Sequence, residues 1–206
     1  MAELGEVLRK EPQVISLDPK YLGDVLDDIR RVGQATGTED AAQALTGQMQ
    51  ARIDAVVERA SRSANRPKVL QLEWADPLMC GGHWVVEMVE MAGGISCFGS
   101  KETGALRLDW AQVMSSQPEI IMLMPCGFDL DRAKEDLPLL TVQDGWDSLP
   151  AVRNDRVYVI DAAAYTSRLR PRLVTGLEIM AEIIHPEIFS GMIPDGGAIC
   201  LSEMVS

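Results

Sequence analysis

The chain has 206 residues, 47% of them hydrophobic, and a formal net charge of −12 at pH 7. This length suffices for one large domain, or for one domain with appended helices, whose core needs no disulfide bonds. The acidic charge disfavours nucleic acid and anionic membrane surfaces as partners, because both bind a concentrated positive field.

The first residues, MAELGEVLRKEPQ, carry scattered charges and lack the apolar core of a secretory signal. A short helix is expected there, before residue 14. No later stretch approaches the roughly 20 apolar residues that cross a bilayer. These features predict a chain that spans no membrane and resides in the cytoplasm.

Two helices are predicted next. The first follows Asp18 and Pro19, since aspartate can cap a helix whose first residue is proline. A turn over residues 36–38 separates it from a second helix over residues 39–64, a rod of roughly 40 Å at about 1.5 Å per residue. The apolar residues of this second helix form one stripe at helical spacing: Ala42, Leu45, Met49, Ile53, Val56 and Ala60.

Beyond residue 66, short apolar runs alternate with helical patterns. Strands are predicted over 68–74, 119–125 and 156–162, and helices over 83–92, 109–116, 129–137, 144–152 and 171–185. Strands this apolar are typical of a parallel sheet covered on both faces, and the alternation predicts βαβ units. We therefore expect an α/β fold: a three-layer lobe over residues 67–189 with a mainly parallel central sheet, preceded by a long helix and followed by a loose tail over 190–206.

The loop after the first strand is the leading candidate for a binding site, because ligands of open α/β sheets bind beyond the carboxyl ends of the strands. Its tryptophans supply flat apolar area suited to a large planar ligand. Each tryptophan could instead be a core or lid residue, and the histidine could simply bond to backbone at a helix start. The candidate residues are Trp74, Asp76, Gly82, His83 and Trp84.

Two other strand ends repeat this design. The segment MPCGFDLDR places Phe128 after the second strand, and DAAAYTSRLRPRLV places Tyr165 and Arg168 after the third. Since parallel strands end at the same edge, the three loops are expected to form one polar and aromatic rim.

A thiol enzyme is an alternative hypothesis. Cys80 or Cys126, together with His83 and Asp76, could supply a nucleophile, a base and its orienting group. However, Cys126 is interpreted as a small buried hydrophobic residue, and the four cysteines lack CxxC or CxxxC spacing. The sequence also lacks GxSxG, GxGxxG, Walker and HExxH motifs. We therefore expect no catalytic and no metal-ligating residues.

Five segments carry a family resemblance: SLDPKYLGDVLDDIRRVGQATG, LEWADPLMCGGHWVVEMVEMAGG, MPCGFDLDRA, DGWDSLPAVRNDRVYVIDAAAY and PRLVTGLEIMAEIIHPE. Over roughly residues 12–189 the chain thereby resembles the cobalamin-binding substrate-binding proteins of ABC importers. This resemblance implies two α/β lobes joined by a long helix, with a corrinoid held between them. Residues 1–38 would be a remnant of the N-terminal lobe, 39–66 the linker helix, 67–189 the C-terminal lobe and 190–206 a tail.

The resemblance implies that cobalamin or a related corrinoid is the ligand, with no covalently bound cofactor. Trp74, Asp76, Gly82, His83 and Trp84 would face it, with Phe128, Tyr165 and Arg168 on the neighbouring rim. The chain departs from the family pattern at residues 168–172, which read RLRPR instead of RPGPR. An iron chelate or haem is the alternative ligand, since fold does not fix ligand.

The resemblance also bears on partners. Because the N-terminal lobe is missing from this sequence, the stripe on the long helix is expected to be partly uncovered. Exposed apolar surface of this kind predicts a homodimer, or a partner that supplies the second lobe.

Overall fold

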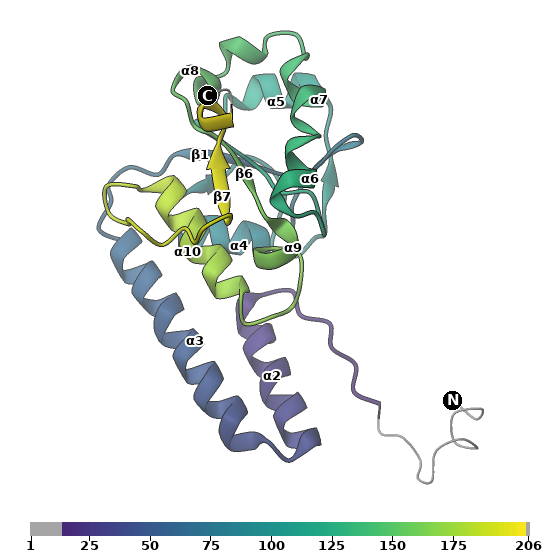
Figure 1. The fold of residues 1–206 in the computed structure, drawn as a ribbon, viewed down its shortest axis with the longest axis vertical. Coiled ribbons are helices and arrows are strands. Elements are labelled where there is room, and N and C mark those ends of the chain that lie inside the picture. Colours follow the sequence, from purple (N-terminus) through teal and green to yellow (C-terminus); the bar gives the residue numbers. More distant parts are fainter. Residues whose placement is uncertain (1–13, 205–206) are drawn as a thin grey trace, which may run out of the picture.

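The computed structural model describes residues 14–204, so the short helix expected before residue 14 lies outside the described residues. A seven-stranded sheet forms the centre of an α/β lobe, and helices cover both of its faces (Figure 1). The strand order is β4-β2-β1-β5-β6-β7, and β3 also pairs with β1. This mixed, mostly parallel architecture confirms the predicted fold class.

The three predicted strands form the parallel middle of the sheet, as β1 (Lys68–Ala75), β5 (Ile120–Leu123) and β6 (Val157–Ile160). The short β3 (Ile95–Ser96) is also parallel to β1. Three other short strands are antiparallel to their neighbours: β2 (Leu78–Cys80), β4 (Leu106–Arg107) and β7 (Ala198–Cys200). Within β1, Val69 faces one core and Leu70 the other, as alternation along a strand requires.

Two hydrophobic clusters divide the helices between the faces of the sheet. One face carries α4 (Trp84–Met91), α9 (Ala162–Tyr165) and α10 (Leu173–Ile184), with α2 (Leu22–Thr36) and α3 (Glu39–Ala60) packed outside them. The other carries α5 (Trp110–Ser116), α6 (Leu130–Lys134), α7 (Leu137–Thr141), η1 (Trp146–Ser148) and α8 (Pro150–Arg153). The lobe therefore has the three layers that its apolar strands predicted.

Helices α2 and α3 form an antiparallel hairpin that extends beyond the lobe (Figure 1). Gly37, with φ of 70°, provides the left-handed turn between them. The long helix ends at Ala60 and not at residue 64. The expectation of an uncovered stripe is wrong: its residues are buried apart from half-buried Leu45, because α2 and α10 cover them.

The segment after residue 189 is also better ordered than the expected loose tail. Glu182 accepts hydrogen bonds from the backbone N–H groups of Gly191, Met192 and Ile193, which fixes the turn after α10. The chain then returns as β7 along β6 and ends in the short helix η2 (Leu201–Met204). Within residues 14–204, no helix is both long and apolar enough to cross a membrane.

Candidate functional site

The loops that follow β1, β5 and β6 meet at one edge of the sheet. Trp84, just after the first loop, donates its indole N–H to the carbonyl of Thr166 at 2.9 Å. Gly127 N donates to Ser167 Oγ at 3.0 Å, and Ala163 N donates to Phe128 O at 2.9 Å. The structure thus joins residues 74–84, 124–129 and 161–168 into one surface, called the carboxyl rim below.

An aromatic group lies on this rim. The rings of Trp74 and Phe128 meet edge to face, with centroids 5.4 Å apart and planes at 81°. The guanidinium of Arg132 lies over the Phe128 ring, 4.2 Å from its centroid. Both aromatic side chains are half-buried, so each is held by packing and still presents area to a ligand.

The Gly-Gly-His-Trp loop serves the architecture of the rim. A Cβ at Gly82 would overlap the carbonyl of Thr103, so only glycine allows this close approach. His83 caps α4 with φ of 48°, and its N–H bonds to Ser100 O and Thr103 O. Its ring stacks on Trp84 with centroids 6.2 Å apart, and its Nδ1 is buried with no protein partner among residues 14–204. A role in ligand contact stays a prediction for Gly82, His83 and Trp84.

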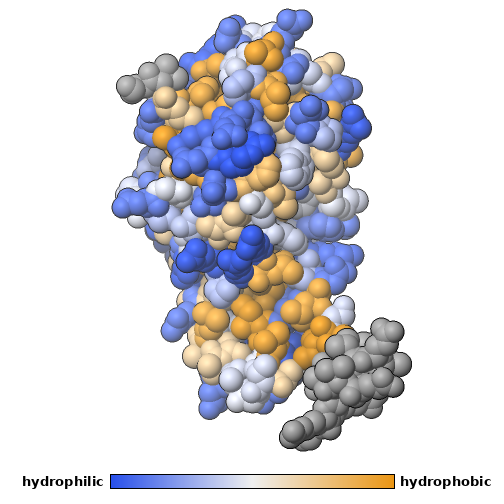
Figure 2. All heavy atoms as spheres, turned by 45° about the vertical axis from the view of Figure 1, so that its right-hand side comes forward, coloured by the Kyte–Doolittle hydropathy of each residue, from blue (hydrophilic) through white to orange (hydrophobic). Residues whose placement is uncertain are grey.

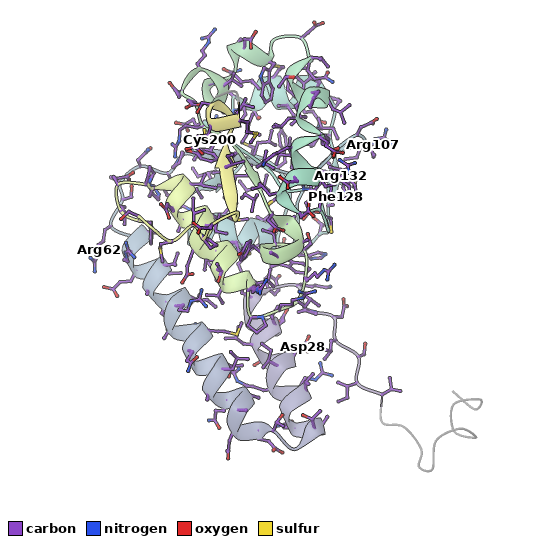
Figure 3. The ribbon with its side chains drawn as sticks, in the orientation of Figure 1. Asp28, Arg62, Arg107, Phe128, Arg132 and Cys200 are labelled. Atoms are coloured by element: carbon purple, nitrogen blue, oxygen red, sulfur yellow. The ribbon has the colours of Figure 1, made fainter. Side chains whose placement is uncertain are left out.

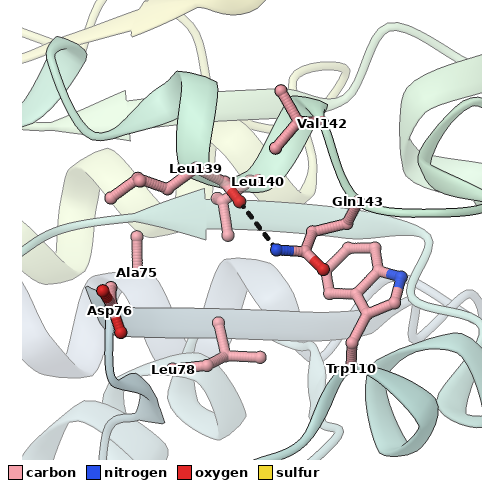
Figure 4. A pocket seen from close by; sticks show the side chains of 8 residues that line it. All are labelled: Ala75, Asp76, Leu78, Trp110, Leu139, Leu140, Val142 and Gln143. Carbon is pink, nitrogen blue, oxygen red and sulfur yellow. Dashed lines mark hydrogen bonds between the residues drawn. The ribbon is translucent and has the colours of Figure 1, made fainter.

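Asp76 lies at the border between the carboxyl rim and a neighbouring pocket. With Trp110 and residues of α7 it lines an open pocket of about 380 Å³ beside the end of β1 (Figure 4). On one wall of this pocket, Gln143 Nε2 donates a hydrogen bond to Leu139 O at 3.0 Å. Neither Trp74 nor Phe128 lines this pocket. A role of Asp76 in ligand contact on the rim stays a prediction.

Tyr165 and Arg168 follow β6 on the rim. Tyr165 ends α9 and is half-buried, and its carbonyl lies against Gly176, where a Cβ on α10 would overlap it. Arg168 is exposed, and within residues 14–204 it has no carboxylate partner. Both side chains lie where the sequence placed them, and their contact with a ligand stays a prediction.

The cysteines do not have the surroundings of reactive thiols. Burial is the main cause that raises the pKa of Cys80, and it raises the pKa of Cys97 to about 11, so both stay protonated near neutral pH. Cys126 is exposed, which contradicts its interpretation as a buried residue: it follows β5 at the open rim. No cluster of three metal-ligating side chains occurs in the described part of the chain.

Sequence reasoning missed three side chains near the rim. Arg132 reaches the rim from α6 through Phe128. Met79 reaches it because β2 pairs with β1, and Arg107 because β4 pairs with β2. Strands of two or three residues have no detectable period, so only the charge of Arg107 in LRL could have drawn notice.

Comparison with known proteins identifies the fold family. Residues 3–164 match the family model described as periplasmic binding protein. The chain belongs to the periplasmic binding protein family. It is also 29% identical, over 177 residues, to the uncharacterized ABC transporter substrate-binding lipoprotein YvrC of Bacillus subtilis, covering 84% of this chain and 53% of that protein. This periplasmic binding protein chain thus spans about half the length of that relative.

Solved structures agree with this membership. An ABC transporter substrate-binding protein from Listeria monocytogenes has a TM-score of 0.74 and 20% identity, covering 90% of this chain and 72% of that one. The haem-binding protein RhuT from Roseiflexus has a TM-score of 0.68 and 26% identity, with coverage of 82% and 65%. The vitamin B12 binding protein BtuF of Vibrio cholerae has a TM-score of 0.68 and 18% identity, with coverage of 90% and 69%.

The expectation of a cytoplasmic protein is wrong. It rested on the charges of the first residues, whereas the matched family is one of periplasmic binding proteins and the matched Bacillus relative is a lipoprotein. The resemblance to substrate-binding proteins of ABC importers is confirmed at the level of the family, without its cobalamin specificity.

Proposed function

We propose that this chain binds cobalamin or a related corrinoid on the carboxyl rim, as the non-catalytic C-terminal lobe of an ABC importer's substrate-binding protein. The observation that carries the proposal is the meeting of three strand-end loops around the half-buried Trp74 and Phe128. A corrin ring is large, flat and mostly apolar, and a rigid aromatic surface held by packing suits such a ligand.

One lobe supplies only part of the contact that such a ligand needs. Trp74 and Phe128 contact each other on a single rim, so a ligand lying there would keep its other face in water. Affinity rises as more of a ligand's surface is buried. We therefore propose that a second lobe, from another part of the protein or from a partner, closes over the ligand.

Haem is the second candidate, and a specific observation favours it. RhuT, named as a haem-binding protein, is the solved relative described above with 26% identity. A thiol enzyme has less support, because the burial that raises the pKa of Cys80 disfavours its nucleophilic thiolate. Among residues 14–204, the Nδ1 atom of His83 also has no protein partner that would orient its ring as a base.

A visible-spectrum titration of the protein with cyanocobalamin, with cobinamide and with hemin tests the proposal. We expect saturable binding of a corrinoid that weakens about tenfold, equivalent to about 1.4 kcal/mol, in Trp74→Ala. Trp110→Ala is the matched control, because Trp110 lines the pocket of Figure 4 instead of the rim. Weaker corrinoid binding in Trp110→Ala alone would instead indicate that the ligand binds in that pocket. Saturation by hemin but by neither corrinoid would favour the haem reading.

A further inference from the structure

A row of paired residues crosses three strands near the rim. Trp74 of β1 lies opposite Met79 of β2, and Met79 lies opposite Arg107 of β4. Residues directly opposite in antiparallel strands place their side chains on the same face of the sheet. The neighbouring pair, Leu72 and Cys80, is buried in one core, so the row belongs to the other face by alternation.

Beyond β1 the row passes around the carboxyl end of the sheet. Trp74 meets Phe128, which packs against the core of the opposite face, and Phe128 carries the guanidinium of Arg132 of α6. The result is an apolar centre of indole, thioether and phenyl groups with a guanidinium at each end. Arg107, Phe128 and Arg132 lie toward the same side of the lobe in Figure 3.

The two arginines differ in how their charge is balanced. Arg132 donates to Asp136 at 2.7 Å and lies 3.6 Å from Glu135, so its charge is neutralised within the protein. Arg107 is exposed, and among residues 14–204 no carboxylate lies within 4.0 Å of its guanidinium. An uncompensated guanidinium beside an aromatic surface, in a chain with a net charge of −12, is free to bind an anion.

We propose that Arg107 is a specificity-determining residue that binds a phosphate or carboxylate at one edge of the planar ligand covering Trp74. This inference rests on the proposed function, and it adds a chemical requirement to the ligand. Two strand spacings of about 4.8 Å separate β1 from β4, which places the anionic group roughly 10 Å from the flat body over Trp74. The planar fork of arginine suits both anions, because each can accept two parallel N–H bonds.

The test uses two pairs of ligands that differ in the anionic group. Cyanocobalamin carries a phosphodiester that cobinamide lacks, and hemin carries two carboxylates that are masked in its dimethyl ester. Dissociation constants of all four compounds are measured for the wild type, Arg107→Gln and Arg107→Lys. Arg153→Gln is the matched control. Arg153 is also exposed, but it is the last residue of α8 and precedes the amino end of β6, whereas the rim lies at the carboxyl end of that strand.

We expect Arg107→Gln to bind the acidic member of the preferred pair about tenfold more weakly, as for loss of one charged hydrogen bond. Binding of the other member should stay unchanged, Arg107→Lys should lose less, and Arg153→Gln should match the wild type. Equal weakening of both members, or none, would overturn the role of Arg107 while leaving the proposed function intact. A wild type that binds none of the four compounds would overturn both.

Discussion

At the scale of single residues, Glu73 stands out beside the rim. Leu72 pairs with Cys80 and Trp74 with Met79, so Glu73 is the extra residue of a β-bulge in β1. Burial raises the pKa of its carboxyl group, and no donor among residues 14–204 bonds to that group. A carboxylate in this position costs stability, because burial removes water from it without supplying a partner.

This cost predicts a pH-dependent effect of Glu73→Gln. The ordinary pKa of this group is 4.5 and the folded value is higher, so the folded state retains the proton more strongly. The contribution of Glu73 to the free energy of unfolding therefore falls as pH rises from 4.5 through the folded pKa. We expect Glu73→Gln to be more stable than the wild type at neutral pH and about equal to it at pH 4, measured by urea denaturation. A less stable variant at neutral pH would show that the carboxylate is stabilised in the folded protein.

At the scale of elements, the rim depends on bonds between loops that are distant in sequence. Trp84 is the first residue of α4, and its indole N–H donates a hydrogen bond to the carbonyl of Thr166, which follows α9. Trp110 makes a comparable bond, from its indole N–H to Asp144 O at 2.7 Å, on the other face of the sheet. The two bonds join loops to helices in the same way, but only the first touches the rim.

Replacing each indole by a phenyl ring separates stability from binding. We expect Trp84→Phe and Trp110→Phe each to lose about 1 kcal/mol of unfolding free energy, as for one hydrogen bond. Ligand affinity should fall only in Trp84→Phe, because only that change loosens the rim. Urea denaturation and the ligand titration are carried out on both variants. Equal affinities would mean that the Trp84 bond does not position the rim.

Several elements were predictable because their signals are local. The strands β1, β5 and β6 and the helix α10 lie within a few residues of their predicted ranges. The helix predicted over 129–137 instead ends at Lys134, and α7 restarts with Pro138 in its first turn. Proline lacks the N–H that an interior helical position needs, which favours this break.

At the scale of the whole molecule, an apolar surface remains on the outer side of α2. Figure 2 shows hydrophobic side chains gathered over the lower part of the molecule, where the helical hairpin lies. Leu17, Val32 and Leu169 are between 41% and 43% exposed, and they line a shallow groove there with Val25 and Ile29. The exposed apolar surface is thus on α2, and not on the stripe of α3.

We propose that this α2 groove mediates self-association of the isolated chain. Light scattering at micromolar concentrations should show a dimer for the wild type and a monomer for Val32→Glu, because a charge on the groove opposes its burial. Val142→Glu is the control, since Val142 is 76% exposed on the opposite face and should leave the dimer intact. A monomeric wild type at these concentrations would contradict the proposal.

The apolar strands, the amphipathic helices and the places where strands end could be predicted from sequence, because they depend on periodicity along a continuous segment. Trp74, Phe128, Tyr165 and Arg168 could therefore be placed at one sheet edge from sequence. The folded structure was needed to show that β2 and β4 bring Arg107 into line with Trp74, that Asp76 lines a pocket with Trp110, and that α2 covers α3. Each of these outcomes depends on pairing between distant segments, and very short strands and helix faces carry no local signal that names their partner.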